Sequence, residues 1–273
     1  MERLRKELAL GVNRFLQLAG ISKATYYRRK RGSKTRSAPA QERIAGLADG
    51  CVEPPPHYGY RRVWALLVRA GIQASPSTVY RWMKRQQRLQ RSPRRQGYRY
   101  SPPPQPEQVG WILGLDFTHW GPYRLCNVIE YQSRICLASE ASLREDAALA
   151  QQALRKALRD ASGLGLPNQS ILVKSDQGSA FKSQPFTALL TQHGCGQQLS
   201  AVGRPEGMGR VERFHRSLKE ECLQFEEVES LEELQHLAAR YRHFYNTQRP
   251  HQALGYKTPM EVIEEAKKVV SFS

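Results

Sequence analysis

The chain has 273 residues, 40% of them hydrophobic, so it can bury a core and is not a disordered protein. No apolar run reaches the roughly 18 residues of a membrane helix, and the charged N-terminus lacks a signal-peptide stretch, which together predict a cytoplasmic protein. The whole net charge of +17 lies in residues 1–110, which hold 23 Lys and Arg against 6 Asp and Glu, so the expected partner is a polyanion, the alternative being a surface that is basic only for solubility.

Residues 1–36 are predicted to form a first helix-turn-helix unit. A short apolar helical stripe is followed by Gly20 as a stop and by Ser22 as the N-cap of a second helix. The second helix is basic and carries Arg28 and Arg29 as expected DNA contacts. Two helices joined by a glycine are common in other proteins too, and this is the alternative interpretation.

Residues 37–92 are predicted to form a second helix-turn-helix unit with a clearer pattern. Helices are expected over 60–70 and 77–90, of which the first ends at Gly71 and the second is capped by Ser75. The second helix turns an apolar face inward and a basic face outward, and the alternative is a basic face that is merely solvated. Its inward residues are Val79, Trp82 and Met83, and its outward residues, taken as DNA contacts, are Arg81, Lys84 and Arg85.

Residues 93–108 are predicted to be an extended, semi-rigid connector, because five prolines fall within them. Arginines and tyrosines alternate at its start, so Arg94 and Arg95 are expected to lie along a DNA backbone. A plain spacer is the alternative that the same composition allows.

Residues 109–265 are predicted to form an α/β core. The order of three strands, helix, strand, helix, strand and two helices is typical of a mixed sheet with helices on its faces. The strands are expected at 111–117, 123–130, 133–139, 170–174 and 197–202, and the helices at 145–161, 184–193, 210–225 and 231–246.

Three carboxylates in this core are candidates for a metal site. Asp116 stands alone in an apolar strand, where an unpaired charge is costly and needs a partner. Asp176 follows a strand at a turn that Gly178 permits, and Glu212 lies in the first turn of a helix. Taken singly, the last two are also typical of an ordinary turn and of a favourable helix dipole. Together they suit Mg²⁺ or Mn²⁺, which prefer oxygen ligands.

The spacing and surroundings of these carboxylates resemble one family, the DDE transposases of bacterial insertion sequences, which have a retroviral-integrase-like core. In that family an Asp, a second Asp and a Glu follow one another, with 35 residues between the last two, as residues 177–211 provide here. The N-terminal module resembles that of the OrfB product of elements with two reading frames. The matching stretches are Leu115-Asp116-Phe117-Thr118, Ser175-Asp176-Gln177-Gly178, Val211-Glu212-Arg213-Phe214-His215, Tyr245-Asn246-Thr247-Gln248-Arg249-Pro250-His251 and Tyr58-Gly59-Tyr60-Arg61-Arg62.

The resemblance implies an RNase H-like core preceded by all-α helix-turn-helix modules. It implies a DDE polynucleotidyl transferase in which Asp116, Asp176 and Glu212 are the catalytic residues and the ligands of two Mg²⁺ or Mn²⁺ ions. Water would cleave the element end, and the freed 3′-OH would then attack target DNA. The implied partners are the double-stranded terminal inverted repeats and target DNA, further copies of the chain and an upstream OrfA protein, on a bacterial nucleoid.

Several cations near the carboxylates are expected to contact DNA. Glu212, Arg216 and Lys219 are spaced to share one helix face, so Arg216 and Lys219 are expected to hold the donor-end phosphates. Arg213 and Lys174 are further expected contacts, and the alternative is a solvated stripe of cations. The sequence departs from the family at Lys174, where His is usual, and at Gly207-Met208, where Asp-Asn is usual.

Other chemistry has little support in the sequence. The five scattered cysteines form no C-x-x-C pair and show no zinc spacing with histidine, and no Walker or G-x-S-x-G motif is present. Two alternatives to transposition stay open. One is a nuclease of the same fold that cuts without joining, and the other is a domesticated or regulatory DNA-binding protein without strand-transfer activity.

Overall fold

The computed structural model describes residues 12–18, 20, 22–23, 58–89, 109–167, 170–200 and 208–271. Among these residues, no helix is long and apolar enough to cross a membrane. The first predicted unit is described mainly through helix α2 (Val12–Leu18). Four of the expected DNA contacts lie outside the described ranges, namely Arg28, Arg29, Arg94 and Arg95.

The second predicted unit contains helices α5 (Tyr60–Arg69) and α6 (Pro76–Arg85). As predicted, Ser75 caps α6, because its side chain accepts a hydrogen bond from the Thr78 backbone N–H at 3.2 Å. The prediction that this helix runs to residue 90 is wrong. Gln87 adopts a left-handed φ of 55°, and the N–H of Arg88 returns to the carbonyl of Met83, so a Schellman motif ends the helix early.

The α5–α6 pair, which we call the helical module, has its own small core. The buried apolar residues predicted on α6 are confirmed, and they pack with residues of α5 and with the chain before it. The indole N–H of Trp64 donates to the carbonyl of Ala74 and so ties α5 to the start of α6. The buried members of this core are Tyr58, Val63, Val79, Trp82 and Met83.

The core domain is built on a five-stranded sheet with the strand order β3-β2-β1-β4-β5. Strands β1, β2 and β3 form an antiparallel meander, whereas β4 runs parallel to β1 and β5 runs parallel to β4. This order and these directions define an RNase H-like fold, as expected. The strand bounds are Ile112–Trp120, Tyr123–Glu130, Cys136–Ser142, Leu172–Ser175 and Gly196–Leu199.

Strand β3 begins three residues later than predicted, because the chain turns first. The carboxylate of Glu130 accepts hydrogen bonds from the backbone N–H and the hydroxyl of Ser133, and Arg134 adopts a φ of 65°. This turn occupies the start of the predicted strand and delays the return to the sheet until Cys136.

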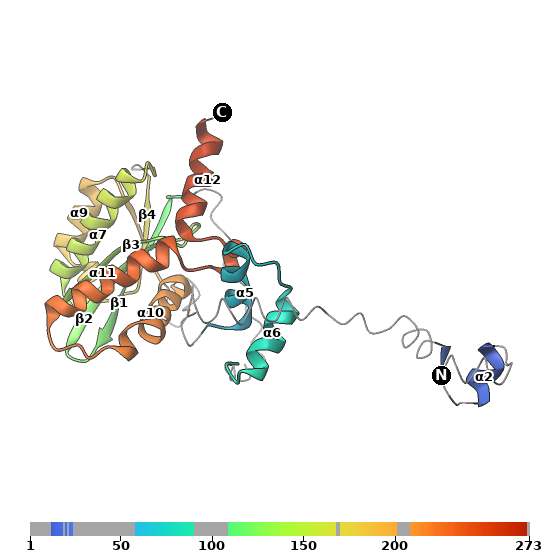
Figure 1. Cartoon of the computed structure of the whole chain (residues 1–273). Helices are drawn as coiled ribbons and strands as arrows, with labels where there is room; N and C mark the ends of the chain where they lie inside the picture. Colours follow the sequence, from blue (N-terminus) through green and yellow to red (C-terminus); the bar gives the residue numbers. More distant parts are fainter. Residues whose placement is uncertain are drawn as a thin grey trace.

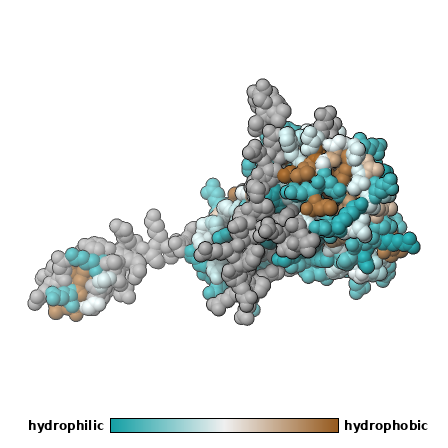
Figure 2. Space-filling model, turned by 180° about the vertical axis from the view of Figure 1, so that it is seen from behind, coloured by the Kyte–Doolittle hydropathy of each residue, from teal (hydrophilic) through white to brown (hydrophobic). Residues whose placement is uncertain are grey.

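Helices cover both faces of the sheet (Figure 1). One face packs on α7, α8 and α9, and the opposite face packs on α10 and α11. Seen from behind, the coloured surface of the core domain is mostly hydrophilic around one hydrophobic patch (Figure 2). The bounds are α7 Ala147–Gly163, α8 Ser179–Lys182, α9 Gln184–Gln192, α10 Gly209–Glu221, η2 Leu223–Phe225, α11 Leu231–Thr247, η3 Gln252–Leu254 and α12 Pro259–Ser271.

Helix α10 lies close to β1 because Gly114 has no side chain. A Cβ added at Gly114 would stand 2.5 Å from a ring carbon of Tyr131 and 2.8 Å from a methyl of Val211. Its neighbours Leu113 and Leu115 point to the opposite face, into the core with α7. Strand β1 is the central strand of the sheet, and α10 packs closely against it at Gly114. The first turn of α10 therefore lies next to the middle of β1.

Candidate active site

Asp116 lies in the middle of β1 and is half buried. One carboxylate oxygen accepts a hydrogen bond from the Phe117 N–H at 2.9 Å. The other oxygen stands 3.7 Å from Nδ1 of His215. Burial, followed by the negative charge of Asp176 and a smaller effect of Glu212, raises the pKa of Asp116 to about 7. Asp116 therefore interacts electrostatically with both other predicted ligands, Asp176 and Glu212.

Asp176 and Glu212 approach Asp116 from two other elements. Asp176 follows β4, the parallel neighbour of β1, and is exposed. Its carboxylate accepts a hydrogen bond from the Gly178 N–H at 2.9 Å, which fixes the turn. Glu212 is exposed in the first turn of α10. Among the described residues, no three His, Cys, Asp or Glu side chains stand close enough together, as they are, to enclose a metal ion.

The donor set at this site nevertheless suits a hard divalent cation. All three side chains offer carboxylate oxygens, which Mg²⁺ and Mn²⁺ prefer. Burial, followed by the charges of the other carboxylates, raises the pKa of Asp116, and a bound cation would oppose that shift. Two of the carboxylates are exposed, so ions from solution can reach them.

His215 is a site residue that sequence reasoning missed. It is buried on α10, three residues after Glu212, so it lies one turn further along the same helix. Burial, together with the charge of Lys219, lowers the pKa of His215 to about 3, so the imidazole is neutral at physiological pH. Because His215 is neutral, it does not neutralise the negative charge of the carboxylates, which bound cations can balance instead. The i, i+3 spacing from Glu212 was the signal available in the sequence.

A second missed feature is a hydrogen bond between two side chains near the end of β1. Nε2 of His119 stands 2.7 Å from a carboxylate oxygen of Glu145, and both side chains are exposed. The charge of Glu145 also contributes to the raised pKa of Asp116. Glu145 is therefore a fourth carboxylate in the neighbourhood of the site.

The structure places most of the predicted cations on two surfaces. Arg213 and Arg216 are exposed and Lys219 is half buried, all on α10 with Glu212. The second surface is the outer face of α6, where the three predicted basic residues are exposed. They are Arg81, Lys84 and Arg85.

Lys174 differs from these cations because it packs against the protein. Its ammonium lies 5.5 Å from the centre of the Tyr131 ring. The guanidinium of Arg210 lies 4.7 Å from the same ring. Burial, together with the charge of Arg210, lowers the pKa of Lys174. Two cations thus share the ring of Tyr131, which follows β2, and one of them, Lys174, lies on β4, the strand that leads to Asp176.

Comparisons with known proteins match both the core domain and the helical module. Two models described as integrase core domain match residues 106–205 and 193–259, and a model described as HTH-like domain matches residues 44–97. The chain is 26% identical over 272 residues to the insertion element IS407 uncharacterized 31.7 kDa protein of Burkholderia multivorans, covering 96% of this chain and 93% of that one. It is also 26% identical over 231 residues to the Escherichia coli transposase InsD for insertion element IS2A/D/F/H/I/K, covering 77% and 74%.

Among solved structures, the chain is similar to the catalytic core domain of BIV integrase, with a TM-score of 0.47 and 19% identity over 59% of this chain and 99% of that one. It is also similar to the HTLV-2 integrase catalytic core domain in complex with magnesium, with a TM-score of 0.43 and 19% identity over 57% and 98%.

The RNase H-like sheet and the two matches to the integrase core define the class: this is a polynucleotidyl transferase core of the integrase type. The helical module, matched as an HTH-like domain, and the insertion-element relatives then place the chain within that class. In sequence and domain order it is similar to transposases of bacterial insertion elements, as the resemblance of its motifs indicated.

Proposed function

We propose that this protein cleaves the ends of an insertion element and joins the freed 3′-OH to target DNA, with Asp116, Asp176 and Glu212 as the catalytic triad. The observation that carries the proposal is the convergence of three elements: Asp116 stands on β1, Asp176 follows the neighbouring parallel strand β4, and Glu212 stands in the first turn of α10, which packs against β1. The raised pKa of Asp116, caused first by burial and then by the charges of the other two carboxylates, agrees with this arrangement. Two neighbouring parallel strands and one helix supply these groups, so each stands on a rigid element, as a preorganised site requires.

The three carboxylates would hold two Mg²⁺ or Mn²⁺ ions through their oxygens. When bound, such ions neutralise charge on a scissile phosphate and favour in-line attack by an oxygen nucleophile. The chain's own contribution is to hold the carboxylates in place. The Phe117 N–H orients Asp116, and the Gly178 N–H orients Asp176. The neutral His215 adds no charge that would compete with the cations.

Two basic surfaces would bind the DNA substrate. On α10, Arg216 and Lys219 follow Glu212 on one helix face and would hold the donor-end phosphates, with Arg213 and Lys174 as neighbours. On α6, the exposed face with Arg81 would bind the terminal inverted repeat. Two element ends must be held together for joining, so we expect the active species to contain more than one copy. Its DNA substrate would place it in the bacterial cytoplasm.

The experiment is an in vitro assay with labelled element ends, plasmid target and Mg²⁺. Asp116→Asn should remove both cleavage and joining while the affinity for an end fragment stays within about three-fold, because one neutralised carboxylate mainly removes charge stabilisation. The matched control is Asp146→Asn. Asp146 caps α7 through a bond from the Leu149 N–H at 3.0 Å, and Asn preserves that cap.

The outcomes separate the alternatives. Undiminished strand transfer by Asp116→Asn would refute the catalytic assignment. Cleavage without joining by the wild-type protein would favour a nuclease. DNA binding without either reaction would favour a regulatory or domesticated protein.

A further inference from the structure

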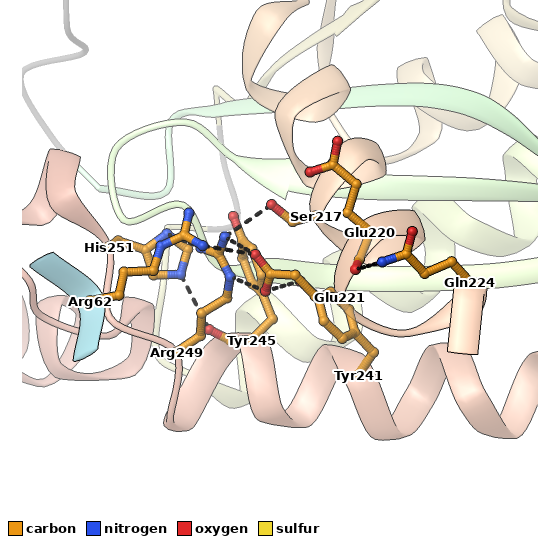
Figure 3. A network of polar contacts seen from close by, with 9 residues as sticks. All are labelled: Arg62, Ser217, Glu220, Glu221, Gln224, Tyr241, Tyr245, Arg249 and His251. Atoms are coloured by element: carbon orange, nitrogen blue, oxygen red, sulfur yellow. Dashed lines mark hydrogen bonds and ion pairs between the residues drawn. The ribbon is translucent and has the colours of Figure 1, made fainter. Parts of the chain in front are cut away.

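Glu221, the last residue of α10, is the centre of a buried ionic network (Figure 3). Its side chain is only 4% exposed. It accepts hydrogen bonds from Nε and Nη2 of Arg249 at 2.7 and 2.6 Å, and from the Tyr241 hydroxyl at 3.0 Å. A further donor is Nη1 of Arg62, at 3.0 Å. One carboxylate therefore joins α10, α11, the tail that follows α11 and helix α5 of the helical module.

The network is built to stay charged. Burial opposes ionisation of Glu221, but the hydrogen bonds and charge of Arg249, with the charge of Arg62, hold the pKa of Glu221 below its usual range. Arg249 is itself buried and also donates to the Ser217 hydroxyl at 3.0 Å. The Arg-Pro-His tail motif therefore turns its arginine into the protein rather than toward a DNA phosphate.

A second set of contacts joins the same two parts of the chain. Arg69 donates to a carboxylate oxygen of Glu261 at 2.6 Å and to the carbonyl of Tyr256 at 3.0 Å. Trp64 meets the ring of Tyr256 edge-on, with the ring centres 5.4 Å apart. Phe244 of α11 packs against both the core of the helical module and the core beneath α10. The helical module is thus seated on the tail by apolar and polar contacts together.

Two arginines of α5, Arg62 and Arg69, form ion pairs near opposite ends of that helix. Arg62 and Arg69 are seven residues apart, so they lie on one face about two turns from each other. The first reaches α10 and the second reaches α12, as the side-by-side placement of these helices in Figure 1 allows. Two anchors on one face prevent α5 from rotating about either one.

We infer that the Arg62–Glu221–Arg249 network is a lock that fixes the helical module on the catalytic core, with Arg62 as a positioning residue for the reaction. Glu221 lies nine residues after Glu212 on the same helix, a separation of about 13 Å at 1.5 Å per residue. DNA held by α6 is then presented to the carboxylates at a set distance. This inference rests on the proposed function, in which α6 binds DNA and the three carboxylates cut it.

Arg62→Ala is the variant that tests the lock in the full-length chain. The Arg62 side chain is 28% exposed, and its loss leaves Glu221 paired with Arg249, so the core should fold. Arg62→Lys can still reach Glu221 with one bond and serves as the conservative rescue. The matched control is Arg240→Ala, which removes a 2.5 Å ion pair with Glu226 that stays within the core domain.

Small-angle X-ray scattering without DNA provides the first readout. Arg62→Ala combined with Arg69→Ala should increase the radius of gyration, because both anchors of α5 are gone, whereas Arg240→Ala should leave it unchanged. This measurement does not depend on catalysis, so it decides the lock even if the proposed function fails. An unchanged radius in the double variant would overturn the inference.

Single-turnover cleavage at saturating element-end DNA provides the second readout. Arg62→Ala should slow cleavage by about ten-fold or more and spread the cut positions, since small misplacements of reacting groups are costly. Its affinity for the end fragment should stay within about three-fold, because α6 is intact. Arg62→Lys should recover part of the rate and Arg240→Ala should match wild type. Wild-type rate and cut position in Arg62→Ala would overturn the positioning role, whereas a wild-type protein that cuts nothing would defeat the proposed function instead.

Discussion

Replacing Gly114 by alanine should push α10 away from β1 and so displace Glu212 relative to Asp116. The new methyl group would stand 2.5 Å from a carbon of Tyr131 and 2.8 Å from Val211. Carbon atoms prefer separations of about 3.5–4.0 Å, so both neighbours would have to retreat by about an ångström. Val211 directly precedes Glu212, so this retreat shifts the first turn of α10.

The expected cost follows from overpacking of a filled core, which is typically about 1–3 kcal/mol. Urea unfolding monitored by circular dichroism should report that loss of free energy of unfolding. The melting temperature should fall by about 2–4 °C for each kcal/mol of unfolding free energy that is lost. The matched control is Gly163→Ala at the end of α7, where an added Cβ meets nothing within 4 Å. That change should be neutral or stabilising by up to about 1 kcal/mol, since alanine suits a helix better than glycine.

Cleavage activity adds a second test of the same geometry. At a temperature where Gly114→Ala is still fully folded, we expect cleavage to drop by about ten-fold or more, because Glu212 is displaced from Asp116. Equal stability and activity for Gly114→Ala and Gly163→Ala would refute the reasoning that a close α10–β1 approach sets the site.

Three further predictions concern charge. Burial, with the charge of Arg249, holds the pKa of His251 well below its usual value. The folded state therefore loses stability as the pH falls below about 6.5, where the unfolded chain takes up the proton. Urea titrations at neutral pH and at about pH 5 should show a smaller loss of unfolding free energy for His251→Gln than for the wild-type protein. Equal losses in the two proteins would contradict this. Arg81→Ala and Lys84→Ala should each weaken DNA binding and flatten its salt dependence by about one unit of log–log slope, so an unchanged slope would argue against phosphate contacts on α6. Arg216→Glu should abolish binding of the element end, and full strand transfer by that variant would sink the donor-end assignment.

Much of the fold could be predicted because the signals are local. The Ser75 cap and the apolar run of β1 each depend on residues close in sequence. The early end of α6 could not be predicted in the same way, because Gln87 takes a left-handed conformation that glycine usually occupies. Helix α12 was missed although Thr258 and Glu261 form a capping box, each backbone N–H bonded to the other side chain.

The candidate site was only partly within reach of the sequence. Asp116 stands out as a lone charge in an apolar strand, and family motifs indicated its two partners. The contact of His215 with Asp116 depends on how closely α10 approaches β1, which no local pattern encodes. Likewise, Arg62 and Glu221 are 159 residues apart in the chain, so only the packed structure reveals their ion pair.

The central claim is that the three carboxylates hold the ions that drive DNA cleavage and joining. The most direct measurement is a titration with Mn²⁺, followed by electron paramagnetic resonance, of the protein bound to a pre-cleaved element end. We predict two bound ions per active site in the wild-type protein and a loss of this binding in Asp116→Asn, with Asp146→Asn unchanged. Mn²⁺ binding that is equal in the wild-type protein and Asp116→Asn would contradict the account.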